Sequence, residues 1–239
     1  MLNYILVIPA RLKSSRLKNK PLLKIKKIPM IIRTAMKCNT IVDKSKILIA
    51  TDSKKIIKLC KENNFNSILT SKKCQTGTDR VFEVSKKIKA NYYINVQGDE
   101  PILNPNDLKK MIKSLPKKNN KEKVFLGYCK FKSKKIMLNK NIPKVIFDKK
   151  KKLIYASRAP IPSQKNTIKE SGFRQILIYV YSKEVFKKFE KLYNKKSFLE
   201  QSEDIEILRF IENNIDVKLI KMSNLSKSVD TLKDLKEVE

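Results

Sequence analysis

The chain has 239 residues, 41% of them hydrophobic, and a formal net charge of +32, a composition that suits one soluble domain with a substantial core. It has no histidine and four widely spaced cysteines, which excludes His-dependent nucleophilic catalysis and argues against a zinc site. No apolar run approaches the roughly 20 residues that span a bilayer, and the N-terminus has no signal-peptide pattern, so we expect a cytoplasmic protein without a membrane partner.

The first half of the chain alternates short apolar runs with amphipathic stretches. Four runs rich in Ile, Val and Tyr predict strands, at residues 4–8, 46–50, 67–70 and 92–96. The amphipathic stretches predict helices at residues 30–39, 53–62 and 79–89. A further helix over residues 105–115 is expected to begin with Asn104 as its cap and Pro105 at its first position. This alternation indicates a parallel sheet with helices on both faces.

The pattern changes in the second half. Strands are predicted at residues 124–131, 144–147, 153–157, 175–181 and 217–220, and helices at 183–193, 197–213 and 231–238. We interpret residues 133–198 as an antiparallel insertion, serving as a lid or dimerisation element, within a single domain of residues 1–239. The expected fold class is α/β, a Rossmann-like, mostly parallel sheet with helices on both faces and a smaller antiparallel insertion.

A basic loop follows the first expected strand. It carries Arg11, Lys13, Arg16, Lys18 and Lys20. Cations beyond the end of a buried strand are suited to bind a polyphosphate. The loop lacks the glycine spacing of a P-loop or a dinucleotide-binding fingerprint, so side chains would have to hold the anion. The alternative is a solvated basic loop.

Carboxylates follow the fourth expected strand and precede the last helix. Asp99 and Glu100 lie in NVQGDEP, and Asp230 lies in VDT. Magnesium takes one or two carboxylates together with phosphate oxygens, so these residues and the basic loop predict a metal–phosphate site. The alternative is that the carboxylates cap the helices that follow.

Three further segments carry polar chemistry. Residues 74–80, CQTGTDR, offer backbone amides and hydroxyls to a base or phosphate, although helix capping explains them equally well. Arg158, in the proline-locked SRAPIP loop, suits a carboxylate or phosphate. Glu200, Glu203 and Glu206 share one expected helix, for which a solvated face is the default interpretation.

The basic charge is mostly lysine. The 55 basic residues are 48 lysines and 7 arginines, and lysine is spread over the whole chain, which is typical of a compositional bias. No nucleic-acid-binding motif accompanies the charge, so we expect no nucleic-acid partner. A basic nucleic-acid-binding protein is the competing class of function.

Taken in chain order, the motifs resemble the 3-deoxy-manno-octulosonate cytidylyltransferase family, the CMP-Kdo synthetases. They are IPARLKSSRLKNKPL (8–22), IATD (49–52), TGTDR (76–80), NVQGDEP (95–101), PKVIFD (143–148), SRAPIP (157–162), FRQILIYVY (173–181), LEQSEDIEILR (199–209) and VDT (229–231). The resemblance implies a nucleotide-diphospho-sugar transferase fold, CMP transfer from CTP to an acidic 2-keto-3-deoxy sugar, pyrophosphate release, Mg²⁺, a homodimer and a role in lipopolysaccharide biosynthesis.

The resemblance also implies site residues. Catalytic residues would be Arg11, Lys20 and Asp99. Nucleotide-binding residues would be Arg11, Arg16, Lys20, Thr76, Gly77, Thr78, Arg80 and Gln97. Sugar-binding residues would be Gln97, Arg158, Gln175, Tyr179 and Glu203, and metal ligands would be Asp99 and Asp230.

One departure from the family pattern concerns the sugar. Gln175 stands where the family commonly has histidine, and Gln can form hydrogen bonds but cannot ionise. Activation of another ulosonic acid, either a Kdo variant or a sialic-type acid, is therefore an alternative function. An inactive paralogue is a further one.

Overall fold

The computed structural model describes residues 3–13, 17–117, 123–163, 165 and 170–238. The chain divides into two compact units. Unit 1 comprises Met1–Lys117 and Leu225–Glu239, and unit 2 comprises Lys118–Asn224. None of the helices in the described ranges is long and apolar enough to cross a membrane.

Unit 1 contains a four-stranded parallel sheet in the order β6-β1-β4-β5. Its strands are β1 (Tyr4–Ala10), β4 (Ile47–Thr51), β5 (Asn66–Leu69) and β6 (Tyr92–Val96). Every residue of β4 and β6 is buried, as expected for parallel strands covered on both faces. The strands predicted from the first half of the sequence are thus all observed.

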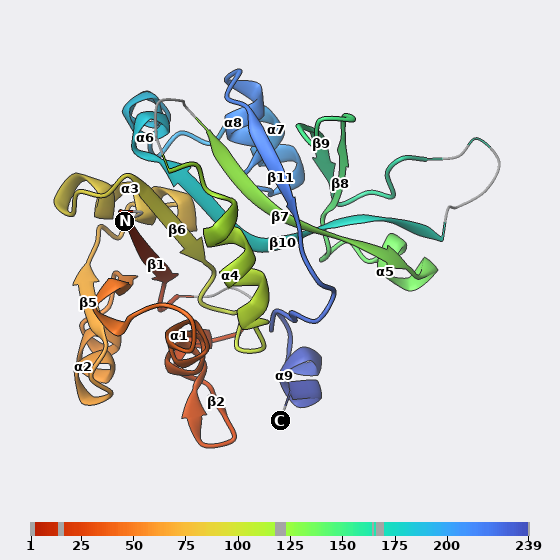
Figure 1. The fold of residues 1–239 in the computed structure, drawn as a ribbon. Helices are drawn as coiled ribbons and strands as arrows, with labels where there is room; N and C mark the ends of the chain where they lie inside the picture. The colour runs from red at the N-terminus through yellow and green to blue at the C-terminus, as the bar shows by residue number, and fades with distance from the viewer. Residues whose placement is uncertain (1–2, 14–16, 118–122, 164, 166–169, 239) are drawn as a thin grey trace. The chain divides into compact units, whose positions relative to one another are not determined.

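Four helices surround this sheet (Figure 1). They are α1 (Met30–Asn39), α2 (Lys54–Glu62), α3 (Gly77–Lys87) and α4 (Pro105–Ser114). Helix α3 contacts β1, β4 and β6, whereas α2 contacts β4 and β5. Asn104 caps α4 by accepting a hydrogen bond from the amide of Asn106, as the sequence predicts.

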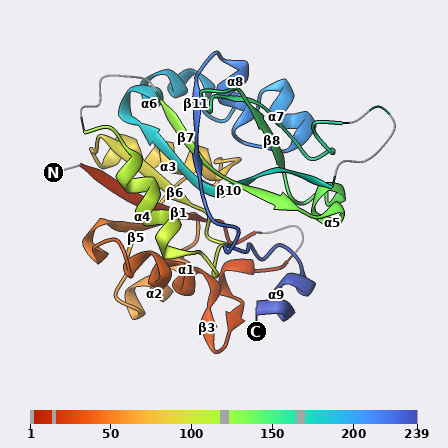
Figure 2. The same cartoon turned by 45° about the vertical axis from the view of Figure 1, so that its right-hand side comes forward.

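A small hydrophobic cluster joins distant parts of unit 1. The basic loop ends in the short helix η1 (Lys20–Leu22), and a hairpin of β2 (Lys24–Ile25) and β3 (Ile28–Pro29) follows it. Elsewhere in unit 1, the short helix η2 (Lys44–Lys46) precedes β4. The last helix, α9 (Leu232–Val238), lies near this hairpin in both ribbon views (Figures 1 and 2). Leu235 and Val238 of α9 pack against a buried cluster that includes Leu17, Met30 and Val229. The chain on either side of Asp230 is therefore fixed by this packing.

Unit 2 is built on the long antiparallel pair β7 (Val124–Lys132) and β10 (Ser171–Ser182). Strand β11 (Val217–Lys221) runs parallel to β7, β8 (Lys144–Phe147) pairs with β10, and β9 (Leu153–Ser157) pairs with β8. Its helices are α5 (Lys134–Leu138), α6 (Lys183–Phe189), η3 (Glu190–Leu192), α7 (Phe198–Glu203) and α8 (Leu208–Glu212). The α/β prediction, a mostly parallel sheet with antiparallel strands, is confirmed.

The single helix predicted over residues 197–213 is wrong. It is divided into α7 and α8, because Asp204 ends α7 in the left-handed conformation, with φ of 49°. Aspartate tolerates this conformation better than most residues. The break turns Glu203 and Asp204 toward residues 157–158, with which both form hydrogen bonds.

Candidate functional site

Three loops of unit 1 meet at the carboxyl ends of neighbouring parallel strands, which is where open α/β sheets bind ligands. Gly98 follows β6, and a Cβ atom there would lie 2.7 Å from the Pro9 carbonyl oxygen of β1. A Cβ atom on Gly77, at the start of α3, would lie 2.9 Å from Gln97 Nε2 and 3.2 Å from Pro9 Cγ. Glycine at both positions therefore permits Gly98 to lie close to the end of β1, and Gly77 to lie close to Gln97 and to the same strand.

Lys20, Asp99 and Asp230 converge at this part of unit 1. Lys20 Nζ donates to Asp99 Oδ2 at 2.6 Å and to Asp230 Oδ1 at 3.0 Å. Burial by itself would lower the pKa of Lys20, but attraction to the two carboxylates outweighs burial, and the pKa is raised. The ammonium is therefore held in its charged form between two negative groups.

Backbone contacts fix the positions of both carboxylates. The amide of Val229 donates to the carbonyl of Asp99 at 2.9 Å, which ties the acidic turn to the C-terminal segment. Asp234 in α9 accepts from the amides of Asp230 and Thr231 at 3.0 and 2.8 Å. The metal-ligand candidates thus come together although they are separated by more than half of the chain.

The acidic pair fits a hard divalent cation. Asp99 Oδ1 is buried and accepts no hydrogen bond, so one carboxylate oxygen has an unused coordination position. The described residues contain no cluster of three His, Cys, Asp or Glu side chains suited to a metal. Magnesium commonly uses one or two carboxylates and completes its shell with phosphate oxygens and water, so this pair matches its requirement.

Arg80 and Asp52 connect α3 to the basic loop. The Arg80 guanidinium is almost fully buried, where Nη2 lies 3.3 Å from Asp52 Oδ2 and Nη1 donates to the Thr70 hydroxyl. The other carboxylate oxygen of Asp52 accepts from the amide of Leu12 at 3.2 Å. Arg80 therefore holds Asp52 in place, and Asp52 in turn holds the backbone at Leu12, next to Arg11.

Unit 2 contains a separate polar cluster around the SRAPIP loop. Glu203 Oε1 accepts from the Ser157 hydroxyl at 2.6 Å, and Oε2 accepts from the amide of Arg158 at 2.8 Å. The Arg158 guanidinium donates to three backbone carbonyls, those of Glu203, Lys140 and Asp204, at 2.6 to 2.9 Å. Both side chains thus hold the loop in place.

Lys144 lies beneath the same loop and is fully buried. Its ammonium donates to the carbonyls of Arg158 and Asn139 at 2.5 and 3.1 Å. Burial and repulsion from Arg158 lower the pKa of Lys144 to about 8, although Glu203 partly opposes this change.

Comparisons with known proteins identify the family of this chain. The family model described as "Cytidylyltransferase" matches residues 5–221. The chain belongs to this family. A 3-deoxy-manno-octulosonate cytidylyltransferase of Chloroherpeton thalassium (strain ATCC 35110 / GB-78) is 35% identical, covering 98% of this chain and 96% of the relative. The protein of the same name from Escherichia coli is 30% identical, covering 98% of this chain and 94% of that relative.

Solved structures agree with this cytidylyltransferase assignment. A structure of CMP:2-keto-3-deoxy-manno-octonic acid synthetase complexed with CTP has a TM-score of 0.88 at 30% identity, covering 98% of this chain and 96% of its own. HddC from Yersinia pseudotuberculosis complexed with GMP-PN, at 17% identity, has a TM-score of 0.69, covering 99% of this chain and 98% of its own. The second likeness shows the fold alone. The family and the nucleotidyltransferase class predicted from the motifs are confirmed.

In the structure of this chain, the residues predicted to bind the nucleotide differ in exposure and in hydrogen bonding. Arg11 is exposed, and Arg16 lies outside the described residues. Thr76 and Asp79 form a reciprocal capping box at the start of α3, in which the Thr76 hydroxyl accepts from the Asp79 amide at 3.1 Å. Thr78 is buried beside them. The predicted turn is thus a rigid helix start.

Two sugar-site candidates lie on β10. Gln175 is buried, and its Oε1 accepts no hydrogen bond, so its carbonyl is available to a donor. Tyr179 is also buried and follows a register shift between Ile176 and Tyr179, which changes how the strand presents its side chains. The sequence indicated neither this bulge nor the role of Lys144, although a lysine within the strand-like PKVIFD run was a usable signal.

Proposed function

We propose that this cytidylyltransferase transfers CMP from CTP to 3-deoxy-D-manno-octulosonate (Kdo), giving CMP-Kdo and pyrophosphate for lipopolysaccharide biosynthesis. The observation that carries the proposal is the convergence of Lys20, Asp99 and Asp230 in a chain 35% identical to a curated relative named for this activity. In such a triad, the two carboxylates can hold a divalent cation and the ammonium can bind phosphate oxygens.

The reaction needs positioning and charge neutralisation more than covalent catalysis. The anomeric hydroxyl of the sugar would attack the α-phosphorus of CTP in line with the departing pyrophosphate. Arg11, Arg16 and Lys20 would bind phosphate oxygens, and negative charge develops on these oxygens during transfer. No histidine is required for this chemistry.

Asp99 and Asp230 would hold Mg²⁺. When bound, the ion would neutralise phosphate charge and favour ionisation of the attacking hydroxyl. The unused, buried Oδ1 of Asp99 supports this role. Thr76, Gly77, Thr78 and Gln97 would line the nucleotide site, and Arg80 would act on it through Asp52.

For the sugar, we propose direct contacts from Gln97, Gln175 and Tyr179. Arg158 and Glu203 would shape the sugar site by holding the SRAPIP loop, since their side chains already bind that loop. The unused acceptor of Gln175 suits a sugar hydroxyl. Residues 133–198 stay predicted as a lid or dimerisation element.

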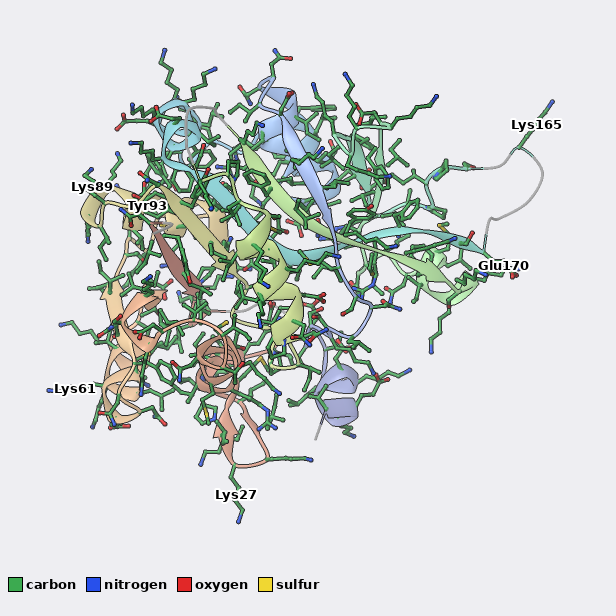
Figure 3. The ribbon with its side chains drawn as sticks, viewed as in Figure 1. Lys27, Lys61, Lys89, Tyr93, Lys165 and Glu170 are labelled. Carbon is green, nitrogen blue, oxygen red and sulfur yellow. The ribbon has the colours of Figure 1, made fainter. Side chains whose placement is uncertain are left out.

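We further propose that the protein works as a cytoplasmic homodimer without nucleic-acid or membrane partners. Exposed lysine side chains such as Lys27 and Lys61 point away from the ribbon (Figure 3). This agrees with the interpretation of the lysine excess as a compositional bias of a solvated surface. The homodimer rests on the family resemblance, and size-exclusion chromatography with light scattering would test it.

Pyrophosphate release from CTP, Mg²⁺ and Kdo tests the main proposal. We expect release only when the sugar acid is present and CMP-Kdo as the second product. Asp99→Asn should lose this activity. Asp43→Asn is its matched control, because Asp43 is an exposed helix-capping carboxylate of unit 1. Failure to consume CTP with any ulosonic acid would contradict the proposal.

Gln175 supports a second candidate, activation of a different ulosonic acid. An uncharged amide recognises hydroxyl groups and carries no positive charge for a carboxylate. The same assay with a nine-carbon sialic-type acid distinguishes the two candidates. Turnover of that acid, and not of Kdo, would favour the second.

A further inference from the structure

The Lys20 ammonium is placed where it competes with a divalent cation. It contacts Asp99 Oδ2 at 2.6 Å and Asp230 Oδ1 at 3.0 Å, so one positive group joins both proposed metal ligands. All three side chains are mostly shielded from water. A shielded pair of carboxylates repels itself, and the ammonium relieves that repulsion.

A divalent cation bound by both carboxylates would have to displace the ammonium. Mg²⁺ binds its oxygen ligands at about 2.0–2.1 Å, and two of the four carboxylate oxygens already contact Lys20. The repulsion between Mg²⁺ and an ammonium in the same shielded position is severe. The structure therefore holds the metal ligands in a state that disfavours the metal alone.

A bound nucleotide would give the Lys20 side chain alternative partners. Its backbone is fixed, since the amide of Lys20 donates to Leu17 and the carbonyl accepts from Leu23, at 3.1 and 3.2 Å. The flexible four-carbon stem leaves the ammonium free to change partners. A triphosphate offers it oxygen atoms, and the released carboxylates can then hold the metal.

We propose that Lys20 acts as an internal substitute for the metal, so that tight divalent-cation binding requires nucleotide. The inference rests on the proposed CTP and metal site of unit 1. It adds that Lys20 couples the two ligands. Because binding linkage is reciprocal, the divalent cation would strengthen nucleotide binding by the same factor.

Mn²⁺ binding, measured by calorimetry or electron paramagnetic resonance without nucleotide, tests the coupling. Lys20→Met should bind Mn²⁺ about tenfold more tightly than the unchanged protein, within the usual range of coupling between ligands. A non-hydrolysable CTP analogue should tighten Mn²⁺ binding to the unchanged protein about tenfold, and should tighten it much less in Lys20→Met.

Lys18→Met is the matched control. Lys18 lies in the same loop, is exposed, and its replacement changes the net charge by the same amount. We expect Mn²⁺ affinity close to that of the unchanged protein, which would exclude a general electrostatic effect. Adding Asp99→Asn to Lys20→Met should abolish the gain, because one of the two carboxylates is then neutral.

Equal or weaker Mn²⁺ binding by folded Lys20→Met would overturn the proposal. If Lys20→Met does not fold, Lys20→Gln supplies an uncharged amide donor for the carboxylates and should show the same gain. Because Mn²⁺ binding is measured without the sugar, loss of Kdo turnover alone would overturn the proposed function and leave this coupling intact.

Discussion

The charged clusters of the two units differ in how completely their groups are paired. In unit 1, Lys20 serves two carboxylates, and Asp99 retains a buried oxygen without a partner. In unit 2, Arg209 and Glu200 form a two-point ion pair at 2.5 and 2.7 Å, and both side chains are only 1% exposed. The Phe189 ring lies 5.2 Å from the Arg209 guanidinium.

The difference in pairing fits the role in chemistry proposed for the unit 1 cluster and a role in stability for the unit 2 pair. A fully paired, buried ion pair has little capacity to bind a ligand, and breaking it leaves an uncompensated charge. A cluster with an unused acceptor and an exchangeable cation can accept new partners. The predictions below test this distinction through losses of stability or of activity.

The largest effect is expected in unit 2. Glu200→Gln should lower the free energy of unfolding by about 3–5 kcal/mol, because the Arg209 charge is left buried and unpaired. Urea denaturation measures the change. Glu184→Gln is the control, since the Glu184–Lys187 pair is partly exposed and is worth at most about 1 kcal/mol. Equal losses in the two variants would contradict the distinction.

Asp99→Asn should reverse the pattern. We expect CTP turnover to fall about 100- to 1,000-fold, equivalent to about 2.7–4 kcal/mol of transition-state stabilisation. Stability should change by less than about 1 kcal/mol, because Lys20 keeps Asp230 as a partner. Steady-state pyrophosphate assays and urea denaturation give the two values. Near-normal turnover would rule out Asp99 as a metal ligand.

Arg80→Lys tests support for the basic loop. Lysine lacks the guanidinium fork, so the contact with Asp52 and, through it, the Leu12 amide should weaken. We expect the KM for CTP to rise about tenfold, or about 1.4 kcal/mol, with little change in kcat. Amide hydrogen exchange at Leu12 should become faster.

Thr70→Val provides the comparison for Arg80→Lys. It removes the hydroxyl that Arg80 Nη1 contacts but leaves the contact with Asp52. It should lower stability without changing the KM for CTP. A rise in KM as large as that for Arg80→Lys would show that general loosening of α3 is responsible.

The last prediction is a pH dependence of stability from Lys144. Its pKa is about 8 in the folded protein and near 10.5 when unfolded, so the unfolded state binds more protons between these values. Stability should therefore rise from pH 8 toward pH 10.5 through this group. Urea denaturation of the unchanged protein and Lys144→Met should show a steeper rise in the former. Parallel curves would contradict the lowered pKa.

The sequence predicted the parts of the fold whose patterns are local. Residues 47–51 and 92–96 are mostly apolar runs that are covered on both sides, and such runs mark buried parallel strands. The break at Asp204 was not predictable from periodicity, because the helical pattern continues across it. It depends on left-handed backbone at one residue and on contacts with residues 46 positions away.

The candidate site was also predictable only where local sequence motifs mark its residues. Lys20, Asp99 and Asp230 lie in motifs, and the structure brings all three together. The hydrogen-bond partners of Arg80, Arg158 and Glu203 were not predictable. A sequence motif identifies a residue but does not determine whether its side chain faces a ligand or another part of the protein. Long-range hydrogen bonds decide that question.

The division of unit 1 into two stretches of chain has a consequence for folding. The contact between Lys20 and Asp230 closes a loop of 210 residues, and all of unit 2 lies within that loop. Such non-local contacts form late, because the entropy of loop closure is lost before the contact compensates for it. During synthesis, a nascent chain that ends before residue 225 can build much of its hydrophobic core but lacks the second carboxylate. We therefore expect the protein to bring its two proposed metal ligands together only in the last steps of folding.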